Sequence, residues 1–268
     1  MVLHIAIDGI DCTGKTTHTR HLLEFFKNKK YKVTVRSTPV HPPILKILTE
    51  YNLLNHEIAL LTAFDRSLTY YGENWEEYDL VLWDTSILHD YAYLTDENTH
   101  QVYIKQLNRY FPLLDLYIII KTDEYIREQD DQLHNNYSLI RKYEELETHK
   151  NTKTVKYHKN EPEKTFEEIV KTIFDNLPRC NWCGKLFTPN QKRYKYCTDE
   201  CAKYSKEEQY RINTRNYYHR YKDVMSEKQK GGLGSKGANL HGTPDPNPLV
   251  EMEKLRKHRR AVGLKPFK

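Results

Sequence analysis

The chain has 268 residues, 38% of them hydrophobic, and a formal net charge of +5. That length can bury at least one full hydrophobic core and leaves room for a second, smaller module. No apolar run approaches the roughly 20 residues of a membrane span, and the first residues lack the features of a secretory signal. These features argue against a membrane or secreted protein, and we expect a cytoplasmic protein with no membrane partner.

Positive charge is concentrated in the last third of the sequence. Residues 179–268 contain 21 Lys and Arg against 9 Asp and Glu, a net +12, so residues 1–178 carry a net −7. Pro178 also interrupts a helical pattern just before the first of four clustered cysteines. The sequence therefore predicts a first domain at residues 1–178, a four-cysteine module with a basic helix at 179–225, and a Gly/Pro-rich linker with a basic tail at 226–268.

The first domain alternates strand and helix patterns along its length. Short apolar, β-rich runs lie at residues 2–7, 32–36, 80–83, 116–120 and 154–157. Helical patterns lie at residues 16–28, 56–71 and 165–177. Nearly continuous apolar strands are typical of a parallel sheet that is covered on both faces. The sequence therefore predicts an α/β fold in which helices flank a parallel sheet.

The segment GIDCTGKT at residues 9–16 follows the first predicted strand and precedes the first predicted helix. It fits the pattern G-x-x-x-x-G-K-[ST], in which two glycines let backbone N–H groups surround a phosphate at a helix N-terminus. Lys15 is expected to reach the β- and γ-phosphates of ATP, and the Thr16 hydroxyl to ligate Mg²⁺. The sequence thus predicts a P-loop NTPase-type fold with ATP bound by Gly9, Asp11, Cys12, Thr13, Gly14, Lys15, Thr16 and Thr17.

The motifs along residues 1–178 resemble, in the same order, those of the thymidylate kinase family. IDGIDCTGKTT is similar to that family's E-G-x-D-x-x-G-K-[ST]-T, and VRSTP to its arginine and proline after the second strand. ALLTAFDRSL resembles L-L-F-x-A-x-R, and VLWDTSILHDYAY resembles a strand followed by D-R-Y-x-x-S-x-x-A-Y. LLDLYIIIKTDEYI resembles P-D-L-x-I-x-L-D-x-x-x-E.

This resemblance implies roles for single residues. It places Asp11 near the phosphate of the acceptor, makes Arg36 the residue that grips this phosphate, and assigns Arg66 to the base and the phosphate. It also implies that Asp84 joins Thr16 in holding Mg²⁺. The implied catalytic residues are Lys15, Asp11 and Arg36, and the implied substrate contacts are Arg36, Arg66 and Tyr93.

The implied reaction is phosphoryl transfer from Mg-ATP to a deoxynucleoside monophosphate, as in a dTMP kinase, and a homodimer is a further expectation. A deoxynucleoside kinase is an alternative, because DTSILHDYAY is also similar to the E-R-S segment of that related family. A third hypothesis is a nucleic-acid-binding protein that uses the P-loop domain as a nucleotide sensor or as a polynucleotide end-processing enzyme.

The sequence departs from the family pattern where cations are expected. Thr85 stands in place of the arginine of D-R-Y, and Thr62 in place of the phenylalanine that stacks on the base. Thymidylate kinases carry a transition-state arginine in the P-loop or in a lid, yet Cys12 and Thr13 are not basic. The lid segment REQDDQLHNNYSLIRK is acidic through its middle. The remaining candidates for this cation are Arg127, Arg141 and Lys142.

Four of the five cysteines are spaced C-x2-C-x13-C-x3-C. Two close pairs separated by a short segment can place four thiolates around one tetrahedral Zn²⁺, which leaves no open position for catalysis. The sequence therefore predicts a structural zinc site at Cys180, Cys183, Cys197 and Cys201, similar to small treble-clef or ribbon-like zinc knuckles.

The residues after Cys201 form a basic helical pattern. Arg211, Arg215 and Lys222 alternate there with several tyrosines, a mixture that suits contact with phosphates and bases. The alternative is a solvated helix that packs its tyrosines on the first domain. The net charge of residues 179–268 favours DNA or RNA as a partner, without distinguishing the two. Residues 230–248 read as a flexible linker, followed by a short basic helix at residues 249–260.

Overall fold

The computed structural model describes residues 2–93, 111, 113–122, 133–189 and 194–230. The chain divides into two units, Met1–Pro178 and Arg179–Lys268. Within the described ranges, no helix is both long enough and apolar enough to cross a membrane.

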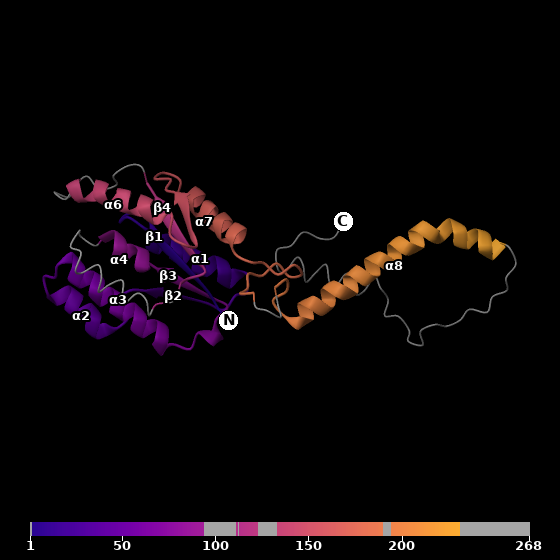
Figure 1. The fold of residues 1–268 in the computed structure, drawn as a ribbon, viewed down its shortest axis with the longest axis horizontal. Helices are drawn as coiled ribbons and strands as arrows, with labels where there is room; N and C mark the ends of the chain where they lie inside the picture. Colours follow the sequence, from indigo (N-terminus) through magenta and orange to yellow (C-terminus); the bar gives the residue numbers. More distant parts are fainter. Residues whose placement is uncertain (1, 94–110, 112, 123–132, 190–193, 231–268) are drawn as a thin grey trace. The chain divides into compact units, whose positions relative to one another are not determined.

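The first unit is built on a five-stranded parallel sheet (Figure 1). Its strands are β1 (Leu3–Gly9), β2 (Val33–Ser37), β3 (Leu80–Asp84), β4 (Leu116–Lys121) and β5 (Thr152–Lys156). They lie in the order β2-β3-β1-β4-β5, and each neighbouring pair is parallel. The chain adds β2 and β3 on one side of β1 and then β4 and β5 on the other. In sheets of this kind, ligands bind outside the carboxyl ends of the strands, where the strand order reverses.

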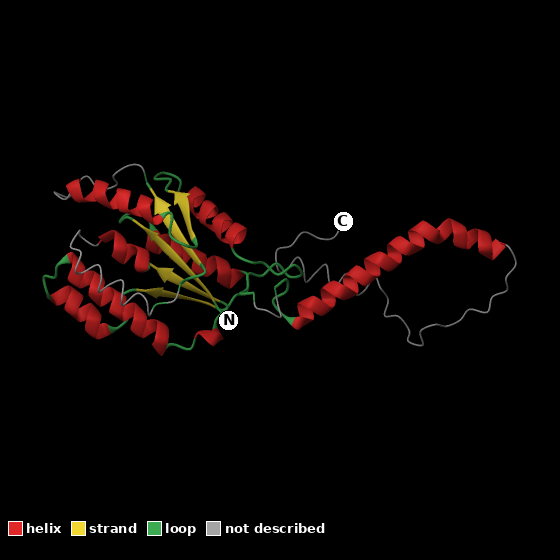
Figure 2. Cartoon of the chain, viewed as in Figure 1, coloured by secondary structure: helices red, strands yellow, loops and turns green. Residues whose placement is uncertain are grey.

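Helices cover both faces of this sheet (Figure 2). On one face, α1 (Lys15–Asn28) packs on β1, β2 and β3, and α7 (Pro162–Asn176) packs on β4 and β5. On the other face lie α4 (Ile87–Tyr93) and α6 (Leu133–Leu146), with α3 (Asn55–Gly72) against α4 and α2 (Pro42–Glu50) against α3. The predicted α/β fold with a flanked parallel sheet is confirmed.

Burial on two faces explains why the strands are so uniformly apolar. Ala6, Trp83 and Tyr117 pack in one cluster with Leu88 of α4 and Tyr143 of α6. Their strand neighbours alternate to the opposite face, and every residue of β1 and β3 is buried. The few polar residues inside these strands, Asp8 and Asp84 among them, therefore need a specific partner or a function.

Three of the helices that the structure describes in the first unit, α2, α4 and α6, are not predicted by the sequence analysis. The helix α4 has seven residues, which is too short for an apolar period to be read. The helix α2 starts with prolines at its first two positions, a start signal that the analysis did not use. The strands lie where they are predicted, with bounds that differ by one or two residues.

His4 lies in β1 among aromatic rings. Its ring centroid is 5.6 Å from that of Tyr70, 5.4 Å from that of Trp75 and 6.2 Å from that of Trp83. The Nε1–H group of Trp83 donates to His4 Nδ1 at 3.1 Å, which fixes a neutral ring with its proton on Nε2. Burial lowers the pKa of His4 from 6.5 to about 4.

This lowered pKa predicts a loss of stability in mild acid. The contribution of the neutral, buried His4 ring to the free energy of unfolding is fully present above pH 6.5. It is lost as the pH falls towards 4, because only the histidine of the unfolded chain takes up a proton between these pH values. At pH 5 the loss is about 2 kcal/mol. Asp8, whose pKa is raised to about 6, acts in the opposite direction, so the effect must be measured against a variant.

His4→Asn is the suitable comparison, because it keeps an acceptor for the Trp83 indole but does not titrate. Urea unfolding of both proteins at pH 7.5 and at pH 5.0 gives the two differences in the free energy of unfolding. The stability of the wild type relative to His4→Asn should be lower by about 2 kcal/mol at pH 5.0. An equal difference at both pH values would show that His4 is not buried in its neutral form.

The second unit begins with an antiparallel bridge between Arg179 and Leu186 and continues into the long helix α8 (Asp199–Lys230). The Thr198 hydroxyl accepts from the Cys201 backbone N–H at 3.1 Å, which caps the start of α8. The helix is described as far as Lys230, so it continues past residue 225, where the basic-helix module is expected to end. The predicted linker after Lys230 and the predicted final helix lie outside the described residues.

Candidate functional site

The loop between β1 and α1 has the backbone that a phosphate cradle requires. Gly9 has φ +141° and Gly14 has φ +77°, values that favour glycine. A Cβ atom on Gly9 would stand 2.6 Å from the backbone oxygen of Ile120, so no larger residue fits there. The Thr13 hydroxyl donates to the oxygen of Ile10 at 2.8 Å and closes the turn from inside.

Lys15 reaches back across this loop from the first turn of α1. Its Nζ donates to the backbone oxygens of Gly9 and Ile10 at 2.9 and 3.0 Å, and to Asp11 Oδ1 at 3.0 Å. The Lys15 side chain is 9% exposed and that of Asp11 is 64% exposed. These three oxygens therefore hold the ammonium group within the loop, next to the exposed Asp11. Phosphate oxygens of a bound nucleotide could take their place as acceptors. Thr16, the next residue, is exposed.

Asp84 ends β3 beside the loop and lies in register with Ile7 of β1 and Ser37 of β2. Its Oδ1 is buried and meets no hydrogen-bond partner among the residues that the structure describes. A buried carboxylate oxygen without a donor is costly unless a cation or water occupies the site. The donor set of Asp84 and Thr16 suits Mg²⁺, which prefers hard oxygen ligands and retains several waters.

Asp8 fastens the P-loop strand to the turn that follows β3. Its Oδ1 accepts from the Ser86 N–H at 2.9 Å and its Oδ2 from the Ser86 hydroxyl at 2.6 Å. Between Asp84 and Ser86, Thr85 has φ +76°, a conformation that threonine rarely adopts. Burial raises the pKa of Asp8 to about 6. The Asp8–Ser86 pair thus holds Asp84 and the P-loop in a fixed relation.

Arg36 does not join the P-loop residues through any contact recorded in the described part of the chain. Its guanidinium pairs with both carboxylate oxygens of Glu73, and Nη1 also donates to Thr34 Oγ1 at 2.6 Å. The Cζ atom of Arg36 lies 5.7 Å from the centroid of the Trp75 ring, over its face. In this structure Arg36 therefore braces the end of α3 against β2.

Arg66 lies deep between α3 and α4. Its Nη1 donates to Asp90 Oδ2 at 2.5 Å, and both side chains are 1% exposed. The Thr62 hydroxyl donates to the other oxygen of Asp90 at 3.0 Å. Arg66 Nε is buried without a hydrogen-bond partner among the described residues. Burial raises the pKa of Asp90, while Arg66 lowers it, so the ionised carboxylate depends on Arg66.

Breaking this buried pair from one side is expected to destabilise the first unit. Asp90→Ala leaves the Arg66 guanidinium buried and uncompensated, at a cost of about 3–5 kcal/mol in the free energy of unfolding. The double variant Arg66→Met/Asp90→Leu removes both charges and should recover most of that loss in urea unfolding. A double variant as unstable as Asp90→Ala would show that packing, rather than the charge, decides the effect.

His89 is a further titratable residue of α4, next to Asp90 in sequence, and the sequence analysis does not single it out. Its Nδ1 lies 3.2 Å from the hydroxyl of Tyr143. Burial lowers the pKa of His89 to about 3, with Lys15 and Arg66 lowering it further and Asp11 raising it. The signal was present in the sequence, because His89 occupies the serine position of D-R-Y-x-x-S-x-x-A-Y in VLWDTSILHDYAY.

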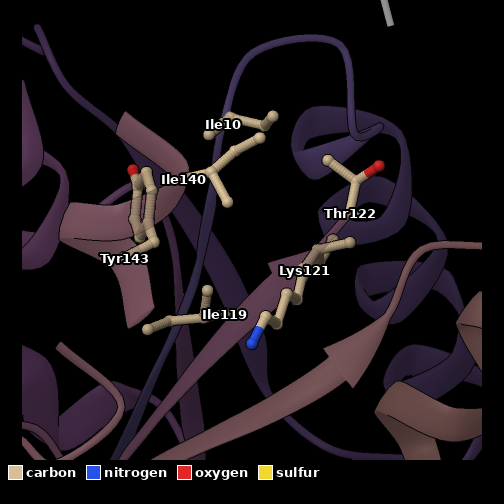
Figure 3. Close-up of a pocket in the computed structure, with 7 residues that line it drawn as sticks. Ile10, Ile119, Lys121, Thr122, Ile140 and Tyr143 are labelled. Carbon is tan, nitrogen blue, oxygen red and sulfur yellow. The ribbon is translucent and has the colours of Figure 1, made fainter. Parts of the chain in front are cut away.

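A small pocket adjoins the P-loop on the side of α6 (Figure 3). Ile140 and Tyr143 of α6 line it together with Ile10 of the loop and the end of β4 at Lys121 and Thr122. Tyr143 therefore lines this pocket and also contacts His89 of α4 through its hydroxyl.

The remaining predicted site residues are placed only in part. Tyr93 ends α4, but its side chain lies outside the description. Arg127 also lies outside the described residues. Arg141 is on α6, is 82% exposed and stands 4.0 Å from Glu145. Lys142, the third candidate for this cation, is half-buried on the same helix.

The second unit brings its four cysteines together. Their Sγ atoms all lie within 4.8 Å of one another, with Cys183 3.5 Å from Cys197 and Cys197 3.6 Å from Cys201. Gly184, with φ +73°, turns the chain after the first pair. The neighbouring Cys180 and Cys183, followed by burial, raise the pKa of Cys197, and a bound cation would favour the thiolate form of all four cysteines. The cluster fits the donor set of Zn²⁺.

Comparison with known proteins decides the family of the first unit. The family model described as thymidylate kinase matches residues 7–175. The chain belongs to the thymidylate kinase family. A probable thymidylate kinase 1 of Saccharolobus solfataricus is 29% identical over 191 residues, which cover 65% of this chain and 97% of that protein. A probable thymidylate kinase of Methanosphaera stadtmanae is 30% identical over 135 residues, which cover 46% of this chain and 68% of that protein.

A solved structure supports the fold of this thymidylate kinase family member. The thymidylate kinase of Ehrlichia chaffeensis superposes with a TM-score of 0.52 at 18% identity, covering 64% of this chain and 98% of that one. Family membership makes the chain a nucleotide kinase, a phosphotransferase, and implies ATP and Mg²⁺ as its donor and metal. The four-cysteine cluster lies beyond the matched residues.

Proposed function

We propose that the chain transfers the γ-phosphoryl group of Mg-ATP to a deoxynucleoside monophosphate, with dTMP as the first candidate. The observation that carries this proposal is the Lys15 ammonium bound within a glycine-bracketed loop, together with a buried Asp84 oxygen at the end of the strand next to β1 that lacks a hydrogen-bond partner among the described residues. The named relatives favour dTMP, because both curated proteins are called probable thymidylate kinases.

In this proposal the loop works by positioning and charge neutralisation. The N–H groups of residues 9–17 surround the donor phosphates, and Lys15 exchanges the loop oxygens for those of the β- and γ-phosphates. Thr16 and Asp84 hold Mg²⁺, which neutralises charge on the donor. Asp11 holds Lys15 at the mouth of the loop until the donor arrives and then faces the acceptor phosphate.

Arg36 and Arg66 orient the acceptor in this proposal, although both are held by carboxylates in the structure. Arg66 is the better supported of the two, because it lowers the pKa of Asp8, a buried residue of the strand that leads into the P-loop. Arg36 would have to leave Glu73 to reach the acceptor. The double variant Arg66→Met/Asp90→Leu therefore has a second use, since a folded protein with a raised KM for the acceptor would support contact through Arg66.

A screen of the purified protein with Mg-ATP tests the function directly. All four deoxynucleosides and their monophosphates are offered separately, and ADP formation is measured together with the phosphorylated product. Turnover of dTMP above the other acceptors supports the proposal. Turnover of thymidine or another nucleoside instead would favour the deoxynucleoside kinase. Binding of ATP without transfer to any acceptor would sink the small-molecule kinase and favour a nucleotide sensor or an end-processing enzyme.

We also propose that the cysteine cluster binds one structural Zn²⁺ and that the second unit contacts DNA or RNA. Tyr194 and Tyr210 are 67% and 72% exposed, and Lys195 Nζ lies 5.2 Å from the Tyr194 ring centroid. Exposed rings with adjacent cations suit the stacking of bases and pairing with phosphates. Tyr217, Tyr218, Tyr221 and Lys222 lie on α8, but their side chains are outside the description.

Fluorescence anisotropy with labelled single-stranded DNA and RNA tests this contact in the full chain. Binding that weakens steeply with salt, and that weakens further in Tyr194→Ala/Lys195→Ala, supports it. Lys46→Ala, an exposed lysine of the first unit, is the matched control. Binding that is independent of salt and of both variants would refute the proposal.

A homodimer is the third proposal, and α3 offers the surface for it. Leu60, Phe64, Leu68 and Tyr71 lie at intervals of four, four and three residues, which places them along one face of the helix. All four are exposed, Phe64 by 46%. A continuous exposed apolar stripe is typical of an interface, and a second copy of this face would cover it.

Sedimentation velocity tests the dimer with Phe64→Lys. The wild type is expected to sediment as a dimer and the variant as a monomer, because the interface would then bury an unpaired lysine ammonium from each of the two copies. Leu113→Lys replaces an apolar residue that is similarly exposed, 45%, but lies outside α3, and should leave the wild-type state unchanged. A monomeric wild type would refute the interface.

A further inference from the structure

Asp65 is a completely buried carboxylate of α3 that the proposed mechanism does not use. Its Oδ2 accepts from the backbone N–H of Val40 at 2.7 Å. Its Oδ1 accepts from the backbone N–H of His41 at 2.8 Å and from His41 Nδ1 at 2.9 Å. Burying a carboxylate costs free energy even when its oxygens are hydrogen-bonded. The segment that receives all three contacts is therefore the place to look for its function.

This segment is the turn between β2 and α2. The first two residues of α2 are prolines, which have no backbone N–H to donate. The oxygen of His41 accepts from the next two amides of the helix, those of Ile44 and Leu45, at 3.0 and 3.1 Å. Val40 and His41 thus provide the last backbone donors before the prolines, and Asp65 accepts from both. The carboxylate fixes the turn and, through His41, the start of α2.

The turn lies at the edge of the sheet where a ligand is expected. It follows the carboxyl end of β2, where Ser37 is in register with Asp84 of β3, and ligands of such sheets bind outside the carboxyl ends of the strands. Val40 is 37% exposed and the His41 side chain 38% exposed. Asp65 therefore holds from below a turn whose outer side is open to a ligand.

The neighbour of Asp65 in α3 holds the segment that follows the adjacent strand. Arg66 Nη1 donates to Asp90 Oδ2 of α4 at 2.5 Å, and α4 begins soon after β3. Consecutive helical residues point about 100° apart, so one turn of α3 can contact two elements. Through Asp65 and Arg66, α3 fixes the chain after β2 relative to the chain after β3. In Figure 1, α3 lies beside both α2 and α4.

From these contacts we infer that Asp65 is a positioning residue for the acceptor nucleotide: it holds the Val40–His41 turn as one wall of the acceptor site. Asp65 is completely buried and acts through the turn, without touching the nucleotide itself. The inference rests on the proposed nucleotide kinase function and deepens it. Arg36, which lies just before this turn in β2, and Arg66 are the two residues proposed to orient the same acceptor.

Asp65→Asn tests the role by kinetics with dTMP and Mg-ATP. Asparagine has nearly the same size but only one acceptor oxygen, so its NH2 group would face one of the two backbone N–H donors. The turn should loosen, and the KM for dTMP should rise about 10- to 10²-fold. The KM for ATP, and kcat at saturating dTMP, should stay within about twofold of wild type, because the contact acts on binding of the acceptor.

Asp79→Asn is the matched control. Asp79 Oδ2 accepts from the backbone N–H of Lys32 at 2.9 Å, a carboxylate–backbone contact that joins β2 and β3 at their amino ends, away from the proposed site. This variant should keep both KM values. Urea unfolding shows whether each variant is folded at the assay temperature. Equal rises in the two KM values of Asp65→Asn, or the same rise in Asp79→Asn, would indicate general destabilisation and overturn the inference.

Hydrogen exchange of the wild type provides a second measurement that needs no variant. If the turn is a wall of the acceptor site, dTMP should slow exchange of the Val40 and His41 amides, because a bound ligand opposes local opening. Mg-ADP, which occupies the donor loop, should leave these two amides unchanged. Exchange that responds to neither nucleotide, or equally to both, would overturn the inference.

These outcomes separate the two proposals. A wild type that transfers phosphate to no acceptor refutes the proposed function and this inference with it. A wild type that phosphorylates dTMP, while Asp65→Asn retains the wild-type KM for dTMP, refutes the inference alone.

Discussion

Replacing Lys15 by methionine is expected to lower kcat for phosphoryl transfer by at least about 10²-fold, comparable to the loss of one preorganised donor in an oxyanion site. Lys15 Nζ is the one group in the described loop that bonds two backbone oxygens and Asp11 at once. Methionine keeps the length and the apolar stem of the side chain but removes the charge. The effect should appear in kcat more than in the KM of the acceptor, because the interaction strengthens as charge develops.

A matched control separates this effect from damage to α1. Lys27 lies on the same helix, is 51% exposed and pairs with Glu24 at 3.1 Å. Lys27→Met should leave kcat unchanged, and both variants should retain the wild-type unfolding midpoint within a few degrees. A Lys15→Met enzyme with wild-type kcat would refute the proposal that this loop holds the transferred phosphate.

The fold followed from the sequence because its strands are buried on both faces. A run such as LYIII carries no charged residue on either face of the strand, so its composition alone indicated a strand buried on both faces. The helix α4 was not readable, because its seven residues include His89 and Asp90, which are polar yet buried or half-buried. Their environment comes from Arg66 and Tyr143, which are distant in sequence, and local propensity carries no information about such partners.

The residues of the candidate site also differ in how well the sequence predicts their contacts. The P-loop was predicted residue by residue, because its backbone geometry is encoded in consecutive positions. The roles of Arg36 and Arg66 were drawn from a resemblance, whereas the structure engages both with carboxylates to which the motifs assign no role. Glu73 lies 37 residues from Arg36, and a one-dimensional motif cannot reveal a partner at that separation. Single-sequence reasoning is therefore strongest for loops and weakest for ion pairs between elements.

Removal of the proposed zinc ion is expected to unfold the start of the second unit while leaving the protein soluble enough to measure. The wild type should contain one zinc per chain by elemental analysis, and Cys197→Ser should contain almost none, because Cys197 Sγ is close to both Cys183 and Cys201. Structural zinc sites contribute about 10–16 kcal/mol of apparent binding free energy. The segment that contains Cys180 and Trp182, residues 179–198, should then become accessible to proteases.

The fifth cysteine provides the control for this experiment. Cys12 lies exposed in the P-loop and outside the cluster, so Cys12→Ser should keep the full zinc content. Cobalt substituted for zinc should give the absorption of a tetrahedral four-sulfur site in the wild type and in Cys12→Ser, and should lose it in Cys197→Ser. Wild-type protein without zinc, and resistant to proteolysis in a chelator, would show that the sulfurs pack together without a metal. In that case the small cluster around Trp182, with Tyr204 stacked 6.2 Å away, would have to stabilise the unit alone.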